Sequence, residues 1–246
     1  MFEKRIRDIS LCKKSRIIVG LDIKLNNPYK LTSKVENILD QIQDEVCAIK
    51  VNFHLLLPLR SKNDLSKIID QAHDYGLQAI ADVKLNDVSS TNLIATGILW
   101  DAGFDAVIAN PFVGFSEGLG PVLEDAHQKD KGVIFLIYMS HKGAVDGYGL
   151  KVLYEGKIRK MYDIFVERAV NWGANGLIVG ATNPKMVAHI KAGAKGIPIF
   201  SPGVIVQGGD PKEAVRAGAD YLIVARAIVE AEKPKEKARE IREITW

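Results

Sequence analysis

Apolar, β-branched runs of five to nine residues recur eight times along the chain, and each is followed by turn residues and a stretch with helical spacing. Near-continuous apolar runs are typical of strands buried on both faces, as in a parallel sheet that helices cover. The pattern therefore predicts eight buried strands. They are expected at residues 16–22, 46–51, 77–84, 105–110, 132–140, 176–180, 197–203 and 221–226.

The segments between these runs carry helix signals. Residues 65–76 form a helical pattern that ends at Gly76, and glycine is favoured just after a helix C-terminus. Ser89, Ser90 and Thr91 are residue types that can cap the next helix. Eight strand–helix alternations over about 230 residues predict an α/β protein with a (β/α)8 TIM barrel. A doubly wound open sheet has the same periodicity and remains the alternative. No linker or compositional shift divides the chain, so we expect residues 1–246 to form a single domain.

Polar side chains stand where these predicted strands end. In (β/α)8 barrels the chemistry lies at the carboxyl ends of the strands, on side chains from several of them. Polar groups gathered there predict a functional site. The residues in question are Asp22, Lys50, Asp82, Lys84, Ser140, Ser201, Pro202 and Arg226.

The sharpest signal is the sequence ADVKLND at the end of the third strand. Asp82 and Lys84 are two residues apart, so both side chains leave the same face of the strand, and Asp87 follows in the loop. Charges at a barrel mouth lose hydration and must be paired to stay ionised. With Lys50 from the neighbouring strand, the sequence predicts an alternating chain of lysines and aspartates with a carboxylate aimed at a bound anion. A strand end with a surface ion pair is the structural alternative.

A second signal is the sequence SPGVIVQGGDP, which joins the seventh strand to a helix expected to begin at Asp210 and Pro211. Gly208 and Gly209 allow the backbone to approach a ligand, and a helix N-terminus favours an anion. Arg226 can hold phosphate oxygens with its planar guanidinium group. Barrels often bind phosphate between the loops after strands seven and eight. We leave open whether residues 204–209 alone cover the site, or residues 143–149 as well.

Composition excludes several other functions. The net charge is only +3 and no basic arm is present, so the sequence offers no electrostatic support for nucleic-acid binding. Cys12 and Cys47 have no disulfide or metal-ligand spacing, and no histidine pair has the spacing of a zinc site. No apolar run approaches the roughly 20 residues that span a bilayer. We therefore expect a soluble, cytoplasmic protein without a metal site.

Taken together, these motifs resemble the orotidine 5′-phosphate decarboxylase family, particularly its short archaeal and bacterial single-domain members. The sequence DVKLND is similar to the family's Asp-x-Lys-x-x-Asp signature. The other motifs occur in the family's order, from about Ile17 to Ile228: LD, IK, MSH, VGAT, SPG, QGGDP and the final Arg226. The resemblance implies a cofactor-free decarboxylase that converts orotidine 5′-monophosphate to uridine 5′-monophosphate and carbon dioxide, the last step of UMP biosynthesis.

The resemblance also implies a role for each site residue. Asp22 and Lys50 would hold the ribose hydroxyls, and Asp82 would lie against the substrate carboxylate. Lys84 would stabilise the C6 carbanion and protonate it. The remaining implied contacts are Asp87 and Thr91 reaching into the partner's site of a homodimer, Ser140 at the pyrimidine beside Pro202, and Gln207, Gly208, Gly209 and Arg226 at the phosphate.

Two positions depart from the expected family pattern, and two rival functions stay open. Ala225 stands where we expect glycine, and residues 110–112 (NPF) stand where we expect histidine and glycine. The first rival is a magnesium-dependent 3-keto-gulonate-phosphate decarboxylase or hexulose-phosphate synthase. In those enzymes the second strand ends in a metal-binding carboxylate, whereas here Lys50 occupies that place. The second rival is a barrel that binds nucleotides without catalysis.

Overall fold

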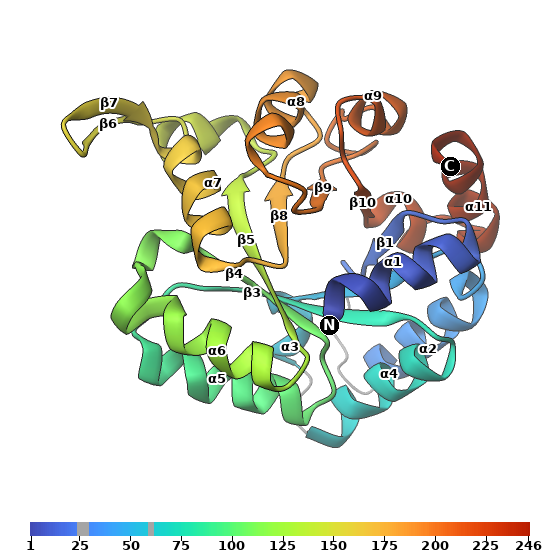
Figure 1. Cartoon of the computed structure of the whole chain (residues 1–246). Helices are drawn as coiled ribbons and strands as arrows, with labels where there is room; N and C mark the ends of the chain where they lie inside the picture. Colours follow the sequence, from blue (N-terminus) through green and yellow to red (C-terminus); the bar gives the residue numbers. More distant parts are fainter. Residues whose placement is uncertain (24–29, 59–61) are drawn as a thin grey trace.

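The computed structural model describes residues 1–23, 30–58 and 62–246, and its centre is a closed eight-stranded parallel barrel (Figure 1). The strand order around the barrel is β1-β10-β9-β8-β5-β4-β3-β2, so the first and last strands close it. All eight predicted strands are present, and the closed order excludes the open-sheet alternative. The strands are β1 (Ile17–Gly20), β2 (Ala48–Asn52), β3 (Gln78–Leu85), β4 (Ala106–Ala109), β5 (Gly132–Tyr138), β8 (Gly176–Val179), β9 (Ile199–Pro202) and β10 (Tyr221–Val224).

Helices cover the outer face of the barrel because each strand buries one side against them. The outward-facing strand residues and the helices form one large apolar cluster, and the inward-facing residues form a second one. No helix in the described part of the chain is long and apolar enough to cross a membrane. The helices are α1 (Phe2–Lys13), α2 (Leu31–Ile42), α3 (Phe53–Leu56), α4 (Lys62–Asp74), α5 (Ser89–Asp101), η2 (Pro111–Val113), η3 (Phe115–Leu119), α6 (Gly120–Gln128), η4 (Lys142–Asp146), α7 (Met161–Trp172), α8 (Pro184–Gly193), α9 (Pro211–Arg216), α10 (Arg226–Val229) and α11 (Pro234–Thr245).

Helix α1 closes the end of the barrel opposite the carboxyl ends of the strands. Phe2 is fully buried and stacks on Phe200 of β9, with ring centroids 6.4 Å apart. Gly132 at the start of β5 makes room for it, because a Cβ there would lie 2.5 Å from the Phe2 ring. Ligand access is therefore left to the carboxyl ends of the strands.

The predicted helix ends are confirmed in two cases and wrong in one. Gly76 follows α4 with a positive φ of 68°, and Asp210 caps α9 by accepting a hydrogen bond from the Glu213 N–H at 2.8 Å. The expected serine or threonine cap of α5 is absent: α5 begins at Ser89, and its N-cap is Val88, without a side-chain cap. The Val88 N–H instead donates to the side chain of Asp87.

A β-hairpin that the strand pattern did not predict projects from the barrel between β5 and α7 (Figure 1). It consists of β6 (Lys151–Tyr154) and β7 (Lys157–Lys160), which pair antiparallel. The turn residues Glu155 and Gly156 have φ of 50° and 75°, as a two-residue hairpin turn requires. The hairpin leaves the eight-stranded barrel unchanged, since neither of its strands joins the main sheet.

Candidate active site

A cavity opens at the carboxyl ends of the barrel strands, where the sequence predicted a site. About 840 Å³ of space, including open solvent at its mouth, lies within it. Its lining includes four large apolar side chains, those of Ile108, Leu136, Ile178 and Ile223. Eight of the predicted site residues line it: Asp22, Lys50, Asp82, Lys84, Ser140, Pro202, Gln207 and Arg226.

Asp82 is held between two lysines at the bottom of this cavity. Its Oδ2 accepts a hydrogen bond from Lys50 Nζ at 2.6 Å, and its Oδ1 accepts one from Lys84 Nζ at 2.6 Å. Lys50 and Asp82 are buried, whereas the Lys84 side chain is 40% exposed. Burial alone would raise the pKa of Asp82, but attraction by Lys50 and then Lys84 outweighs it and holds that pKa below its usual range. Asp82 is therefore a buried carboxylate that stays ionised.

Asn52 also belongs to this charged group, although the sequence reasoning did not identify it. Its side-chain oxygen accepts a hydrogen bond from Lys50 Nζ, and its side-chain nitrogen donates one to Asp22 Oδ1. The connected series is Asp22–Asn52–Lys50–Asp82–Lys84. The available signal was spacing: Asn52 follows Lys50 by two residues on β2, as Lys84 follows Asp82 on β3.

The backbone at Lys84 has an unusual conformation. Its φ is 48°, in the left-handed region that L-residues seldom adopt, and the pairing of β3 with β4 shifts register between Ala81 and Leu85. Such a bulge re-aims a side chain near the end of a strand. Here the Lys84 ammonium group is directed to the Asp82 carboxylate, which lies two residues earlier on the same strand.

Ser140 and Gln207 meet across the mouth of the cavity. The Ser140 hydroxyl donates to Gln207 Oε1 at 2.6 Å and so joins the segment after β5 to the loop after β9. Gly203 permits this approach, because a Cβ there would lie 2.7 Å from the Ser140 Cβ. Of the two segments considered as covers, residues 204–209 contribute to the lining through Val204, Val206 and Gln207, and residues 143–149 contribute nothing.

Gly208 and Gly209 lie beside the cavity but do not line it. Their N–H groups donate to the backbone oxygens of Ile205 and Gly203, at 2.9 and 3.1 Å. In this conformation both groups are used within the loop. Phosphate binding by these two residues stays a prediction and requires the loop to rearrange.

Asp87 and Thr91 are exposed and do not line the cavity of their own chain. Large apolar side chains are exposed around them and on the segments after the neighbouring strands β2 and β4. The most prominent is Ile94, on α5, at 69% exposure. The others are Phe53, Leu57, Val88, Ile98 and Phe112.

Ala225 fits against Gly20 where the first and last strands meet. A Cβ added to Gly20 would lie 3.0 Å from the Ala225 Cβ, so the absence of a side chain on β1 makes room for the methyl group after β10. Ala225 itself lines the cavity, next to Arg226.

The donor set of this site does not fit a divalent cation. Among the residues that the structure describes, no group of three or more His, Cys, Asp or Glu side chains could hold a metal ion. In the cavity, both carboxylate oxygens of Asp82 already accept hydrogen bonds from ammonium groups. Those two positive charges repel a cation.

A closed parallel barrel with a paired lysine–aspartate–lysine group and an arginine in the cavity at the carboxyl ends of its strands is typical of barrel enzymes that act on small anionic substrates. The model of the orotidine 5′-phosphate decarboxylase / HUMPS family matches residues 15–241, and the chain belongs to this family. The predicted resemblance is thereby confirmed.

Individual relatives agree with this assignment. The orotidine 5′-phosphate decarboxylase of Pyrococcus abyssi is 36% identical over 205 residues, covering 83% of this chain and 89% of the relative. That of Pyrococcus furiosus is 34% identical over 228 residues, covering 92% and 96%. The crystal structure of orotidine 5′-monophosphate decarboxylase from Methanocaldococcus jannaschii, complexed with the inhibitor BMP, superposes with a TM-score of 0.78 at 28% identity. It covers 94% of this chain and 98% of that one.

Proposed function

We propose that this chain is an orotidine 5′-phosphate decarboxylase, a carboxy-lyase that forms uridine 5′-monophosphate and carbon dioxide in the last step of UMP biosynthesis. The observation that carries the proposal is the Asp82 carboxylate between Lys50 and Lys84 at the bottom of the cavity. We also take residues 1–246 as one domain that acts without a cofactor in the cytoplasm.

The charged group can promote loss of carbon dioxide directly. A substrate carboxylate about 4 Å from Asp82 is repelled by roughly 4 kcal/mol at an effective dielectric constant near 20. The repulsion of this carboxylate ends when it leaves as neutral carbon dioxide. The bond between C6 and the carboxylate breaks, and its electron pair stays on C6. Lys84 Nζ stabilises this carbanion and transfers a proton to it, and the lysine regains a proton from solvent. These charges are fixed before the reaction, so they need little reorganisation.

Binding energy for this step comes from contacts away from the reacting carbon. Arg226 and Gln207 would hold the phosphate, while Asp22 and Lys50 would hold the ribose hydroxyls. Ser140 and Pro202 would contact the pyrimidine. Contacts to the phosphate, which is remote from the reacting carbon, orient the substrate and favour closure of the loop after β9. In that closed form the N–H groups of Gly208 and Gly209 would turn to the phosphate.

The exposed apolar residues around α5 support a homodimer in which Asp87 and Thr91 reach the partner's site. Contiguous apolar side chains on a soluble protein mark interaction surfaces. Here Val88 directly follows Asp87 in the chain, and Ile94 and Ile98 share helix α5 with Thr91. Exposed apolar residues therefore adjoin the two polar residues that the single chain leaves outside its own cavity. A two-fold axis through this surface would place the same surface on both subunits.

The test is the ultraviolet absorbance of orotidine 5′-monophosphate mixed with the purified protein in buffer that contains a chelator. Steady loss of substrate absorbance with formation of UMP is expected. The Asp82→Ala variant should lose turnover while it still binds UMP, which separates catalysis from mere nucleotide binding. Magnesium-dependent activity on a sugar phosphate would instead favour the reaction of a 3-keto-gulonate-phosphate decarboxylase or a hexulose-phosphate synthase. A parent protein that binds UMP but turns over neither substrate would favour a non-catalytic barrel.

A further inference from the structure

The side chain of Asn52 connects two charged groups of the cavity. On one side is Asp22, proposed to hold the ribose, and on the other is Lys50, which pairs with Asp82. Asn52 ends β2 and its Cα pairs in register with that of Asp82 on β3, so it lies beside the reacting end of the cavity. It lines the cavity together with all of these residues.

The two contacts fix the direction of the amide. An asparagine side chain has an acceptor oxygen and a donor nitrogen. Lys50 has only protons to donate and an ionised Asp22 can only accept, so a single orientation of the amide satisfies both partners. This is the orientation in the structure, with the oxygen toward Lys50 and the nitrogen toward Asp22.

We infer that Asn52 is a positioning residue that couples the sugar-binding carboxylate to the catalytic lysine–aspartate group. This inference rests on the proposed function. Through one rigid amide, the position of Asp22 determines that of the Lys50 ammonium group, and Lys50 in turn orients Asp82. Sugar binding at Asp22 thereby aligns the carboxylate that faces the leaving group. An apolar residue at position 52 would leave both charges without this partner in a partly buried site.

Two variants separate the halves of this contact. Asn52→Leu has a similar size and removes both hydrogen bonds. Asn52→Asp retains an acceptor for Lys50 but replaces the donor to Asp22 with a second carboxylate. The matched controls are Asn171→Leu and Asn171→Asp, because Asn171 is exposed on α7, away from the cavity.

We expect Asn52→Leu to lower kcat/KM for orotidine 5′-monophosphate by roughly 10- to 100-fold, the range for hydrogen bonds to charged groups. This loss is measured on the folded fraction, with Asn171→Leu as the reference, so it is separate from any fall in the melting temperature. A residue that only supports the fold would lower the melting temperature and leave the kinetic constants of the folded fraction unchanged.

The pH profile of Asn52→Asp gives a second readout. At neutral pH the added carboxylate repels Asp22, and toward acid pH a proton shared by the two restores a donor. Activity relative to the parent should therefore rise as the pH falls, and Asn171→Asp should show no such rise. Several charged groups face position 52 or share its cavity and contribute to the same profile. They are Asp22 after β1, Lys50 on β2, Asp82 and Lys84 on β3, and Arg226 after β10.

The outcomes are distinguishable. If the parent turns over orotidine 5′-monophosphate and both Asn52 variants match it in kcat/KM and pH profile, the inference is overturned. If the parent shows no turnover, the proposed function fails first, and titration with UMP then tests the coupling without catalysis. Equal UMP affinity in the parent and in Asn52→Leu would overturn the inference in that case as well.

Discussion

Lys84 Nζ donates a hydrogen bond to Asp82 Oδ1 over 2.6 Å, although the two residues lie on one strand only two positions apart. The strand is not regularly extended at this point, because Lys84 has a left-handed φ of 48°. The ion pair and the bulge in β3 thus belong to one structural feature. Local strain of this kind is common where a catalytic group must be aimed.

The first prediction concerns the proton that Lys84 would deliver. Lys84→Met should lower kcat by about 10²- to 10⁴-fold, the usual contribution of a positioned general acid. The same proton transfer runs in reverse when UMP loses its C6 proton. Nuclear magnetic resonance of UMP in D₂O should therefore show that the C6 proton is replaced by deuterium in the presence of the parent protein. In the presence of the variant it should not be replaced. Exchange at the parental rate in the variant would remove Lys84 from this role.

Arg226 should contribute mainly through the phosphate. Arg226→Ala should lower kcat/KM for orotidine 5′-monophosphate by about 30-fold or more, since it removes charge-assisted hydrogen bonds of roughly 2 kcal/mol or more. The same substitution should have little effect on the slow decarboxylation of orotidine, which has no phosphate. An equal loss for both substrates would mean that Arg226 acts elsewhere. The ratio of the two effects is the quantity to measure.

Ile94 tests the proposed dimer surface. Ile94→Asp should shift the protein toward monomer in sedimentation experiments and lower activity at dilute concentration, because a charge there opposes burial. The matched control is Leu153→Asp on the hairpin, where the side chain is similarly exposed at 77%. That variant should keep the oligomeric state of the parent. A parent that sediments only as a monomer would exclude the shared site of Asp87 and Thr91.

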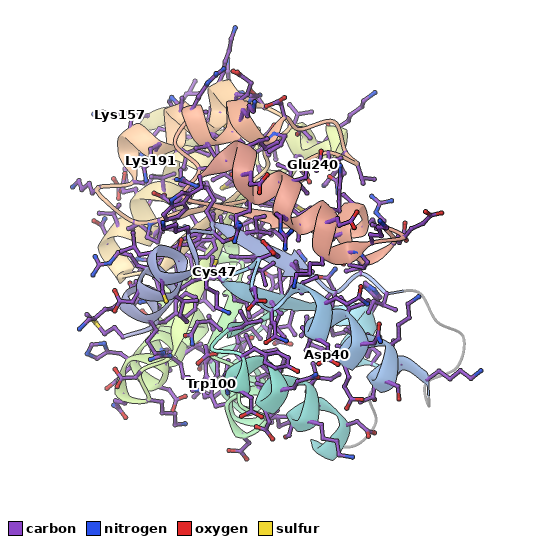
Figure 2. The ribbon with its side chains drawn as sticks, turned by 90° about the vertical axis from the view of Figure 1, so that its right-hand side faces the viewer. Asp40, Cys47, Trp100, Lys157, Lys191 and Glu240 are labelled. Carbon is purple, nitrogen blue, oxygen red and sulfur yellow. The ribbon has the colours of Figure 1, made fainter. Side chains whose placement is uncertain are left out.

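The two thiols should react very differently. Cys12 is exposed on α1, whereas Cys47 is buried, and burial raises the pKa of its thiol to about 12. Figure 2 labels Cys47 near the middle of the molecule. One thiol per chain should therefore react with a thiol reagent in the native protein and two after unfolding, with Cys12→Ser as the control that leaves none reactive in the native state.

Asp105 should make the free energy of unfolding decrease at acid pH. It is buried and accepts hydrogen bonds from the Ala79 N–H at 2.9 Å and Arg5 Nη2 at 3.3 Å, and its Oδ2 lies 2.9 Å from His73 Nε2. Burial raises its pKa, but the hydrogen bonds from His73 and Ala79 outweigh burial, so the pKa lies below its usual value.

Because the folded-state pKa is depressed, this stabilisation is present above the unfolded-state pKa of about 3.9 and is lost as the pH falls through the folded-state value. Asp105→Asn should lower the free energy of unfolding by about 1–3 kcal/mol at pH 7 and by much less near pH 2. Denaturant titrations at the two pH values measure the difference. If the parent and Asp105→Asn differed in free energy of unfolding by the same amount at both pH values, the proposed dependence on the Asp105 pKa would be wrong.

The barrel was predictable because its strands are buried on both faces and read as continuous apolar runs. The charged site was predictable for the same reason, since Asp82 and Lys84 interrupt an apolar strand where burial makes isolated charges costly. Asn52 was not found, because an uncharged amide after an apolar run gives no such signal. Its importance comes from contacts with Asp22, which is distant in sequence.

The hairpin and the start of α5 show a different limit. The strands β6 and β7 are short and rich in lysine, and they bury little surface, so the period of apolar residues is weak there. At α5 three good capping residues follow one another, and the structure uses none of them as the cap. Local preference allows several starting points, and the turn at Asp87 and Val88 selects one.

The contact between Gly20 and Ala225 has an evolutionary consequence. The place where the first and last strands meet has space for one methyl group, and in this chain Ala225, directly after the last strand, supplies it. Relatives that carry glycine at the later position could therefore accept alanine at the earlier one. The side chains at positions 20 and 225 should therefore change together. Gly20→Ala alone should lower stability, and the same substitution combined with Ala225→Gly should be tolerated.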